Sequence, residues 1–489
     1  MKLPSLRFLA SRKFWQRSAF GLAFLSTFIV AAYAIENYRG EKAWADYRAE
    51  AEARGMKLDF KDFIPLRIPD EENFAAIPIY RELLSSDPVV KGSAQKACEL
   101  PDECNSIYRS SLEGRTTPDF AAVRDCLAKN SLLPITTDDA VADVLRALEF
   151  FEPTLAQLRT ASLRPRSRLD GEWEKRYDAA IFGMGGALSL GKLINLRVSA
   201  LLAKGRAHEA LIDWHAGYRH AGIFQGEPTL LACMLRVMLM AQSTDSIRRG
   251  LAERPWSEVE LKSIINDLAA VDLMADFTFG ISSDRAFCNG VLDHVRANPT
   301  VWSSYVSSYL NGNPVKPPRW SWSTPIPRGW FAQNQRHLNE WYDEQIAETV
   351  TAQEHGAMDI PQSDFEVPQS WIRFPYWFVV RATVYMMGGN LIVCRETQAK
   401  VDLSLVACAL ERFRLRNGDY PNELGELVPT VLSKLPRDRF EGKALRYRLT
   451  DHGQVLLYSV GEDCRDDGGE DAKDVVWRSA PVESTQRNR

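Results

Sequence analysis

Residues Val401-Asp-Leu-Ser-Leu-Val-Ala-Cys-Ala-Leu-Glu-Arg-Phe413 carry apolar side chains at helical spacing, near one end of a chain of 489 residues. Leu403, Val406 and Leu410 recur at intervals of three and four, which predicts an amphipathic helix that packs one face on another element. Asn417-Gly418 follows, and both residues tolerate the left-handed conformation that ends many helices. The sequence therefore predicts a helix that stops at this pair.

Two runs after this helix have the pattern of β-strands, and a short apolar run follows them. Leu445 to Leu449 alternates apolar and basic residues, Gln454 to Val460 is almost wholly apolar, and Val475-Val-Trp477 closes the segment. The loop from Gly461 to Asp474 is rich in glycine and acidic residues. Because like charges at this spacing repel, we expect that the loop cannot fold unaided. The pattern predicts one small sheet with an acidic loop.

Four motifs lie in order along this part of the chain. They are Ala409-Leu-Glu-Arg-Phe-Arg-Leu-Arg-Asn-Gly-Asp-Tyr-Pro421, Leu435-Pro-Arg-Asp438, Tyr458-Ser-Val-Gly-Glu-Asp463 and Asp474-Val-Val-Trp477. Together they resemble the C-terminal half of type II secretion major pseudopilins. The resemblance implies a long helix on a small antiparallel sheet over residues 376–480, with calcium bound in the loop before the last strand. It implies Asp463, Asp471 and Asp474 as carboxylate ligands, and the carbonyl of Val460 is a candidate to complete the site.

Two further expectations concern this pseudopilin-like segment. Nothing near Met1 has the form of a pseudopilin leader, so we expect a domain of this type within a larger protein and not a polymerising subunit. The helix is expected to begin near Tyr376. The alternative to a calcium site is a solvated acidic loop that needs no ion.

Ser18 to Ala34 is an uncharged apolar run with basic residues before it and acidic residues after it. The positive side of such a segment stays in the cytoplasm. This predicts a single-pass inner-membrane protein, with its N-terminus inside and its bulk in the periplasm. The run is at the short end of the roughly 17–25 residues that span a bilayer, but Phe14 and Trp15 extend it. Ala32-Tyr-Ala34 also has the form of a signal-peptidase site, so a cleaved signal peptide is the alternative.

The length of the chain exceeds the roughly 100–200 residues of a typical domain, so we expect several folded units. A formal net charge of -4 and a pI near 6.1, without a basic run, argue against nucleic-acid binding. The predicted parts are a cytoplasmic tail and anchor (1–35), a juxtamembrane helix and linker (36–69), a helical domain (70–355), a linker (356–375), the pseudopilin-like domain (376–480) and a tail (481–489).

The strongest helical pattern runs from Ala187 to about Gly290. A break at Lys204-Gly205 predicts an antiparallel helix pair like those of helical-repeat proteins. Ser257 and Glu260 have the spacing of a capping box that starts a later helix. We therefore expect a mainly α fold: an N-terminal membrane helix, a large solenoid-like exported domain and a small C-terminal α+β domain. Stacked helix pairs usually present binding surfaces.

Export makes the eight cysteines informative, because an oxidising compartment permits disulfides. Cys98 and Cys104 flank a polar Pro-Asp loop, which predicts a short local bridge. Cys233 and Cys408 lie in apolar helical surroundings and are predicted to be core thiols. The alternative is that all eight cysteines are free and buried.

Two motifs imitate functional sites. Gly186-Ala-Leu-Ser-Leu-Gly-Lys-Leu193 imitates a phosphate-binding loop, but Leu193 replaces the Ser or Thr that holds magnesium and no strand precedes it, so we expect no nucleotide binding. His208 and His215 share a helical face and His220 follows, which makes a metal site only if a carboxylate converges on them. Packing or surface histidines are the simpler interpretation.

No sequence pattern specifies a reaction, since the commonest signatures of zinc proteases and serine hydrolases do not occur. Pro314 to Trp330 is rich in proline and tryptophan, whose rings either line a groove or pack on the helical domain. We therefore expect a membrane-anchored envelope protein that acts as a non-catalytic binding or scaffold component with a protein partner. The resemblance implies a link to type II secretion or pilus-like machinery. The alternative is an exported, hydrolase-like enzyme with a cleft in the helical domain.

Overall fold

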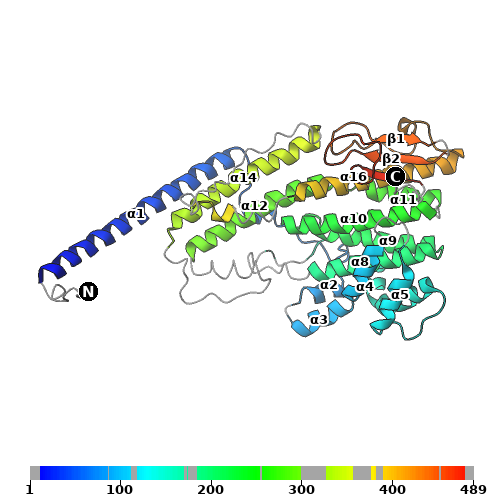
Figure 1. Ribbon diagram of the computed structural model, residues 1–489, viewed down its shortest axis with the longest axis horizontal. Coiled ribbons are helices and arrows are strands. Elements are labelled where there is room, and N and C mark those ends of the chain that lie inside the picture. The colour runs from blue at the N-terminus through cyan, green and yellow to red at the C-terminus, as the bar shows by residue number, and fades with distance from the viewer. Residues whose placement is uncertain are drawn as a thin grey trace, which may run out of the picture. The chain divides into compact units, whose positions relative to one another are not determined.

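The computed structural model describes residues 12–85, 87–111, 118–169, 173, 184–253, 256–298, 326–355, 376–380, 389–450 and 453–479. The chain divides into two compact units. Unit 1 comprises Met1–Asp62, Arg285–Glu344 and Asp364–Met387, and unit 2 comprises Phe63–Asp284, Gln345–Ser363 and Gly388–Arg489. Helices dominate the described parts of both units, and a small sheet belongs to unit 2 (Figure 1). The predicted domains follow one another along the chain, whereas unit 1 combines the first residues with two later segments.

Unit 1 contains α1 (Arg12–Ala53), the last part of α12 (Leu273–Ala297) and the first part of α14 (Arg328–His355). Its buried cluster contains Trp44, Tyr47, Ala51, Leu58 and Ala332. The segment that the sequence predicted as a juxtamembrane helix and linker therefore supplies most of this cluster. The helix is not a free stalk in this part, since its aromatic residues pack inside a folded unit.

Polar contacts fix the directions of the helices in unit 1. Near the start of α14, the backbone N–H of Gly329 donates to Asn37 Oδ1 at 3.0 Å, whereas later in α14 Asp343 accepts from Tyr47 at 2.8 Å. Both helices advance together along these contacts, so α14 runs parallel to α1. In α12 the later residue Arg296 pairs with Glu41, near the Asn37 end. The earlier residue Arg285 pairs with Asp343 at 2.9 Å, so α12 runs antiparallel to both helices.

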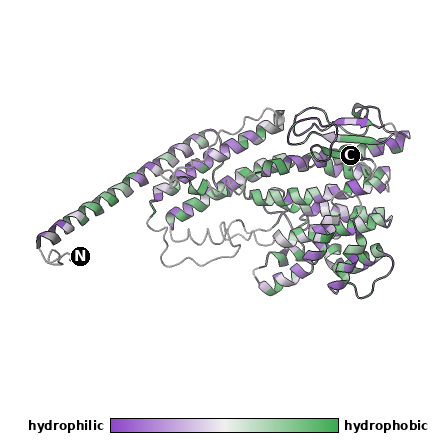
Figure 2. Cartoon of the chain, viewed as in Figure 1, coloured by the Kyte–Doolittle hydropathy of each residue, from purple (hydrophilic) through white to green (hydrophobic). Residues whose placement is uncertain are grey.

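Three of the described helices are long and apolar enough to cross a membrane by length and composition: α1, α8 (Met184–Ala203) and α10 (Leu230–Glu253). The most apolar windows of α8 and α10 are 78% and 67% buried inside the fold, whereas none of that window is buried in α1. Figure 2 shows the corresponding part of α1 in green, the colour of apolar residues. Of these three described helices, α1 alone has a most apolar window that the fold leaves wholly uncovered.

Unit 2 consists of short helices on a set of longer ones. Its other α-helices in the described residues are α2 (Pro78–Leu83), α3 (Pro88–Lys96), α4 (Asp102–Ser111), α5 (Phe120–Lys129), α6 (Ala140–Leu148), α7 (Glu152–Ala161), α9 (Ala207–Ala221), α11 (Glu258–Ala269) and α16 (Asn390–Asn417). The helices α8, α9 and α10 contact one another, while α6 packs on α8 and α7 on α9. The predicted pair is confirmed as α8 and α9, with Gly205 between them at φ +68°. A regular solenoid stays a prediction.

The helix α16 lies at the centre of its part of unit 2. It contacts α10 and α11, and it also contacts the last two strands of the sheet. Every residue from Val401 to Arg412 is buried, so the prediction of an amphipathic helix with one packed face is wrong. The helix begins at Asn390, after Gly389 at φ +83°, and not near Tyr376. Its predicted end is confirmed: Asn417 is the last helical residue and Gly418 follows at φ +92°.

The sheet has three antiparallel strands in the order β1 (Arg446–Leu449), β2 (Val455–Ser459) and β3 (Val475–Arg478). Tyr447 pairs with Leu457, which pairs in turn with Trp477. All five residues of β2 are buried, as expected for a central strand that packs on α16. The two strands predicted from the pattern are confirmed, and Val475–Trp477 lies in the third strand. A helix packed on a small antiparallel sheet is thus present, whereas membership of the pseudopilin family stays a hypothesis.

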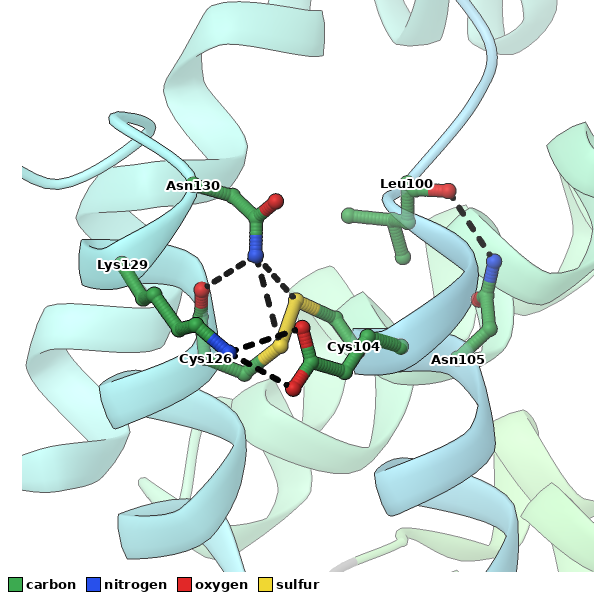
Figure 3. Close-up of a disulfide and its surroundings, with 7 residues drawn as sticks. Leu100, Cys104, Asn105, Cys126, Lys129 and Asn130 are labelled. Carbon is green, nitrogen blue, oxygen red and sulfur yellow. Dashed lines mark hydrogen bonds and ion pairs between the residues drawn. A yellow bond between two sulfur atoms is a disulfide. The ribbon is translucent and has the colours of Figure 1, made fainter.

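One disulfide joins Cys104 in α4 to Cys126 in α5, with their Cα atoms 5.5 Å apart (Figure 3). The predicted bridge between Cys98 and Cys104 is wrong. Because α4 already begins at Asp102, Cys104 lies on a helical face that packs on α5, and Cys98 is fully buried as a thiol. Burial raises the pKa of the Cys98 thiol to about 12.

Two other local predictions are confirmed in unit 2. The Ser257 N–H donates to Glu260 Oε2 at 2.8 Å, and the Glu260 N–H donates back to Ser257 Oγ at 3.4 Å, which completes the capping box of α11. Cys233 and Cys408 are buried thiols, as expected for apolar helical surroundings. Such local signals need no knowledge of the tertiary fold.

Candidate functional site

The acidic loop from Gly461 to Asp474 connects β2 to β3. Asp474 closes it: the side chain is buried, and Oδ2 accepts from the backbone N–H groups of Gly469 at 2.8 Å and Glu470 at 3.1 Å. Gly468 and Gly469 adopt φ of +75° and +87°, which residues with a Cβ rarely do. One buried carboxylate therefore organises a turn that depends on two glycines.

Gly461 is required for a different reason. A Cβ at this position would overlap the carbonyl oxygen of Lys473, so the two ends of the loop are in backbone contact. The backbone φ of Gly461 is accessible to any residue, so the lack of room for a side chain is what requires glycine here. The loop is closed at its base and turned at its tip.

The four predicted calcium ligands have separate partners in the structure. Asp463 Oδ1 accepts from the backbone N–H of Arg465 at 3.1 Å, and Asp471 forms an ion pair with Arg478. The carbonyl of Val460 accepts from Ser459 Oγ at 3.1 Å. Within the described residues, no group of three or more His, Cys, Asp or Glu side chains is arranged to hold a metal ion. The chain alone does not assemble these four residues into one site.

Two carboxylate oxygens in the same loop are nevertheless buried without a hydrogen-bond partner. They are Oδ1 of Asp474 and Oδ2 of Asp467. The other oxygen of Asp467 pairs with Lys473 Nζ at 3.1 Å. Buried acceptors without donors are costly, and a hard cation is the ligand that such oxygens suit. Asp463 and Asp471 have no such oxygen, and the resemblance did not imply Asp467.

Asp438 is a second buried carboxylate near this loop, and it holds the sheet to the preceding segment. It accepts from the backbone N–H groups of Phe440 and Val460, each at 2.8 Å, and from Ser459 Oγ at 2.9 Å. Burial raises the pKa of Asp438. The next residue, Arg439, pairs with the buried Asp402 of α16 at 2.6 Å. Sequence reasoning noted this motif but missed its role.

The three histidines do not converge. His208 is 79% exposed beside Glu260, and His215 pairs with Asp267 at 2.7 Å. His220 is fully buried, with Nδ1 2.6 Å from the Tyr80 hydroxyl and Nε2 2.8 Å from the Ala187 carbonyl. The predicted packing and surface roles are therefore confirmed for these side chains.

The segment that imitates a phosphate-binding loop offers no site. The segment from Gly186 to Leu193 lies inside α8, where its backbone groups belong to a helix and not to a phosphate-binding turn. Most of the proline- and tryptophan-rich segment lies outside the described residues, which resume at Ile326.

Buried carboxylates in the described helical part of unit 2 are paired with donors. Asp213 accepts from Arg159 at 2.5 Å and from Arg197 at 2.8 Å. The other pairs are Asp143 with Arg146, Asp276 with Arg236, and Glu227 with the indole N–H of Trp173. The pairs of Asp213 and Asp276 join different helices, whereas Asp143 pairs within α6.

The comparisons with known proteins give no assignment: no family model, no curated protein and no solved structure matches the chain. The functional argument rests on the geometry above.

Proposed function

We propose that this chain is an uncleaved, single-pass membrane protein whose folded units lie outside the cytoplasm. The observation that carries the proposal is the contrast within α1. Its most apolar window is wholly uncovered, with Phe20 79% and Phe24 72% exposed, while the later residues Trp44 and Tyr47 are buried in unit 1. An uncovered apolar stretch of this length needs a lipid environment, since water would disfavour it.

The geometry after Ala34 favours an anchor over a cleaved signal peptide. The helix is continuous from Arg12 to Ala53, so the Ala32-Tyr-Ala34 motif lies in the middle of a helix. Glu36 and Asn37 already contact α14. Cleavage after Ala34 would place the new N-terminus one residue before Glu36, whose contacts with α14 belong to the folded unit.

For the folded units we propose a non-catalytic binding or scaffold role in the cell envelope, with a protein partner. The paired buried carboxylates Asp213 and Asp276 in the described helices of unit 2 support it, because an acid or base needs a free oxygen at a reacting group. A link to type II secretion or pilus-like machinery is proposed on the sequence motifs and on the helix-and-sheet arrangement of α16 with β1 to β3.

Carbonate extraction of membranes tests the anchor. The chain should stay in the pellet, and its intact mass should include the residues before Ala34. A matched variant, Phe24→Asp with Phe28→Asp, should leave the pellet, because each central charge costs about 2.5–3.5 kcal/mol on insertion scales. A soluble product that begins at Ile35 would contradict the proposal.

We also propose that the acidic loop binds calcium through Asp467 and Asp474. The two buried oxygens without donors support it. Calcium that binds only the folded state would raise the melting temperature of the full-length protein in detergent. The full chain is needed because α16 is buried against α10 and α11 and would be uncovered in an isolated segment.

In this experiment Asp467→Asn with Asp474→Asn should abolish the rise in melting temperature with calcium, whereas Glu462→Gln, an exposed loop residue, should preserve it. Equal melting temperatures for the wild-type protein in calcium and in chelator would contradict the calcium site. The anchor would stand in that case.

A further inference from the structure

Glu36 is a carboxylate with hydrogen-bond partners that lies in α1 just after the apolar run. Glu36 follows Ala34 by two residues, which is about 3 Å along a helix. Its side chain is only 17% exposed. Glu36 Oε2 accepts from the indole N–H of Trp330 at 3.0 Å and from the Tyr376 hydroxyl at 2.9 Å, and Oε1 accepts from Arg39 at 2.9 Å. A charge this close to hydrocarbon is costly unless it is paired, and Glu36 has three donors.

These donors come from separate parts of unit 1. Trp330 lies in the first turn of α14, and Tyr376 lies in the described segment 376–380. Their rings pack edge to face, with centroids 6.0 Å apart. The start of α14 and the segment 376–380 therefore both contact α1 at the end of its apolar run.

Close backbone packing sets this level. A Cβ at Gly40 would overlap the carbonyl of Gly329, and a Cβ at Gly329 would overlap the carbonyl of Glu36. The start of α14 cannot slide along α1 without breaking this fit. Because α14 runs parallel to α1, its first turn is the end of the helix nearest the apolar run, and later turns lie farther away.

The chemistry of this end suits the headgroup layer of a bilayer. Tryptophan and tyrosine are enriched at membrane interfaces, where a ring meets hydrocarbon and a polar tip meets water. Trp330 and Tyr376 are partly exposed. Arg39 is 61% exposed on its side chain, and Arg328 at the first residue of α14 is also exposed. Two guanidinium groups beside the exit of a membrane helix are placed to meet lipid phosphates.

We propose that Arg39, Arg328, Trp330 and Tyr376 form a lipid-binding surface, here called the interface end of unit 1, that rests in the headgroup layer of the membrane that α1 spans. The inference rests on the proposed anchor. It adds that unit 1 has no stalk between it and the bilayer, and that phosphate-bearing lipids are its ligand. The polar layer on each side of a bilayer is only about 5–8 Å thick, so the surface must lie close to the end of the span.

Site-specific photo-crosslinking in the full-length protein tests the proposal. A photoreactive benzoylphenylalanine would replace Arg39, Arg328, Phe24 or Glu344, one at a time, in vesicles of phosphatidylcholine and phosphatidylglycerol. Phe24 lies in the apolar run and reports on the anchor. Glu344 is an exposed residue of α14 that lies about 24 Å beyond Arg328 along the helix, well outside the headgroup layer.

Lipid adducts at Arg39 and Arg328, at a yield comparable with Phe24 and with only background at Glu344, are the expected result. Adducts at Phe24 without adducts at Arg39 and Arg328 would overturn the interface end and leave the anchor intact. Background at all four positions would show that the proposed anchor itself is wrong.

Discussion

The helices α1 and α10 are both long and apolar enough to cross a membrane, yet they have opposite environments. The most apolar window of α10 is 67% buried, and α10 contacts α8, α9 and α16. The same kind of window in α1 has no protein cover. Polar contacts differ too, because Arg236 of α10 pairs with Asp276 at 2.7 Å inside the fold. The difference teaches that apolar composition permits a membrane span, whereas the presence of packing partners determines whether a helix becomes core.

A single aspartate substitution should have the largest difference in effect on the free energy of unfolding between α10 and α1. Val237 in α10 is fully buried, so Val237→Asp would bury a carboxylate without a partner and lower the free energy of unfolding by about 3–5 kcal/mol. Met238→Asp, at the neighbouring 46% exposed position, should change it by less than about 1 kcal/mol. Phe24→Asp should leave the folding of both units unchanged. Urea denaturation in detergent measures all three, and equal effects at Val237 and Met238 would refute the assignment of α10 to the core.

The disulfide reports on the side of the membrane that unit 2 occupies. Cys104 and Cys126 should be recovered as one linked fragment in non-reducing peptide maps, with Cys98 recovered as an alkylated thiol after unfolding. Reduction should lower the free energy of unfolding by about 2–4 kcal/mol. In a variant whose α1 fails to insert, the same two cysteines should be thiols, because the cytoplasm is reducing. A bridge between Cys98 and Cys104 would contradict the structure.

The two halves of α1 should respond differently to a single methyl group. Gly40→Ala places a Cβ into the backbone of Gly329, and such overpacking should destabilise unit 1 by up to about 3 kcal/mol. Gly21 has open space around it, so Gly21→Ala should be neutral. Thermal unfolding of both variants in detergent checks this. A neutral Gly40→Ala would show that α1 and α14 are not closely packed.

The core around α8 should also be sensitive to acid. Burial lowers the pKa of His220 from 6.5 to about 4, so the folded state holds the neutral ring between Tyr80 and the Ala187 carbonyl. The unfolded chain binds the proton more readily. The contribution of His220 is therefore complete above its unfolded pKa and is lost as the pH falls toward 4, by about 2 kcal/mol between pH 7 and pH 5.

Urea midpoints at both pH values measure this loss. His208→Gln, at an exposed position, should keep the pH dependence of the wild-type protein, while His220→Gln should flatten it. An unchanged slope in His220→Gln would show that this ring does not carry the effect.

Sequence reasoning succeeded where the signal is local. The end of α16 at Asn417, the capping box at Ser257 and the first two strands follow from neighbouring residues, and all are confirmed. It failed where a distant element decides. Nothing near Val401 shows that α10 and the sheet cover opposite sides of α16, and nothing near Cys98 shows that α5 brings Cys126 to Cys104.

The candidate site was predictable only in part. The glycines and acids of the loop marked its place, and Asp474 is buried there as a central residue. The choice among the other carboxylates depends on which oxygens the fold leaves without donors. Arg478 occupies Asp471, whereas Oδ2 of Asp467 is left buried without a donor. Those partners lie on β3 and across the loop, so sequence spacing alone does not reveal them.

The central claim is that α1 spans a membrane once and that the units after it lie outside the cytoplasm. A reporter enzyme that needs disulfides for activity, fused after Arg489, measures this directly, because its disulfides form only in an oxidising compartment. The fusion to the full chain should be active, and the same fusion to a chain that begins at Ile35 should be inactive, since it lacks the apolar run. An inactive reporter on the full-length, membrane-bound chain, or equal activity in both fusions, would contradict the account.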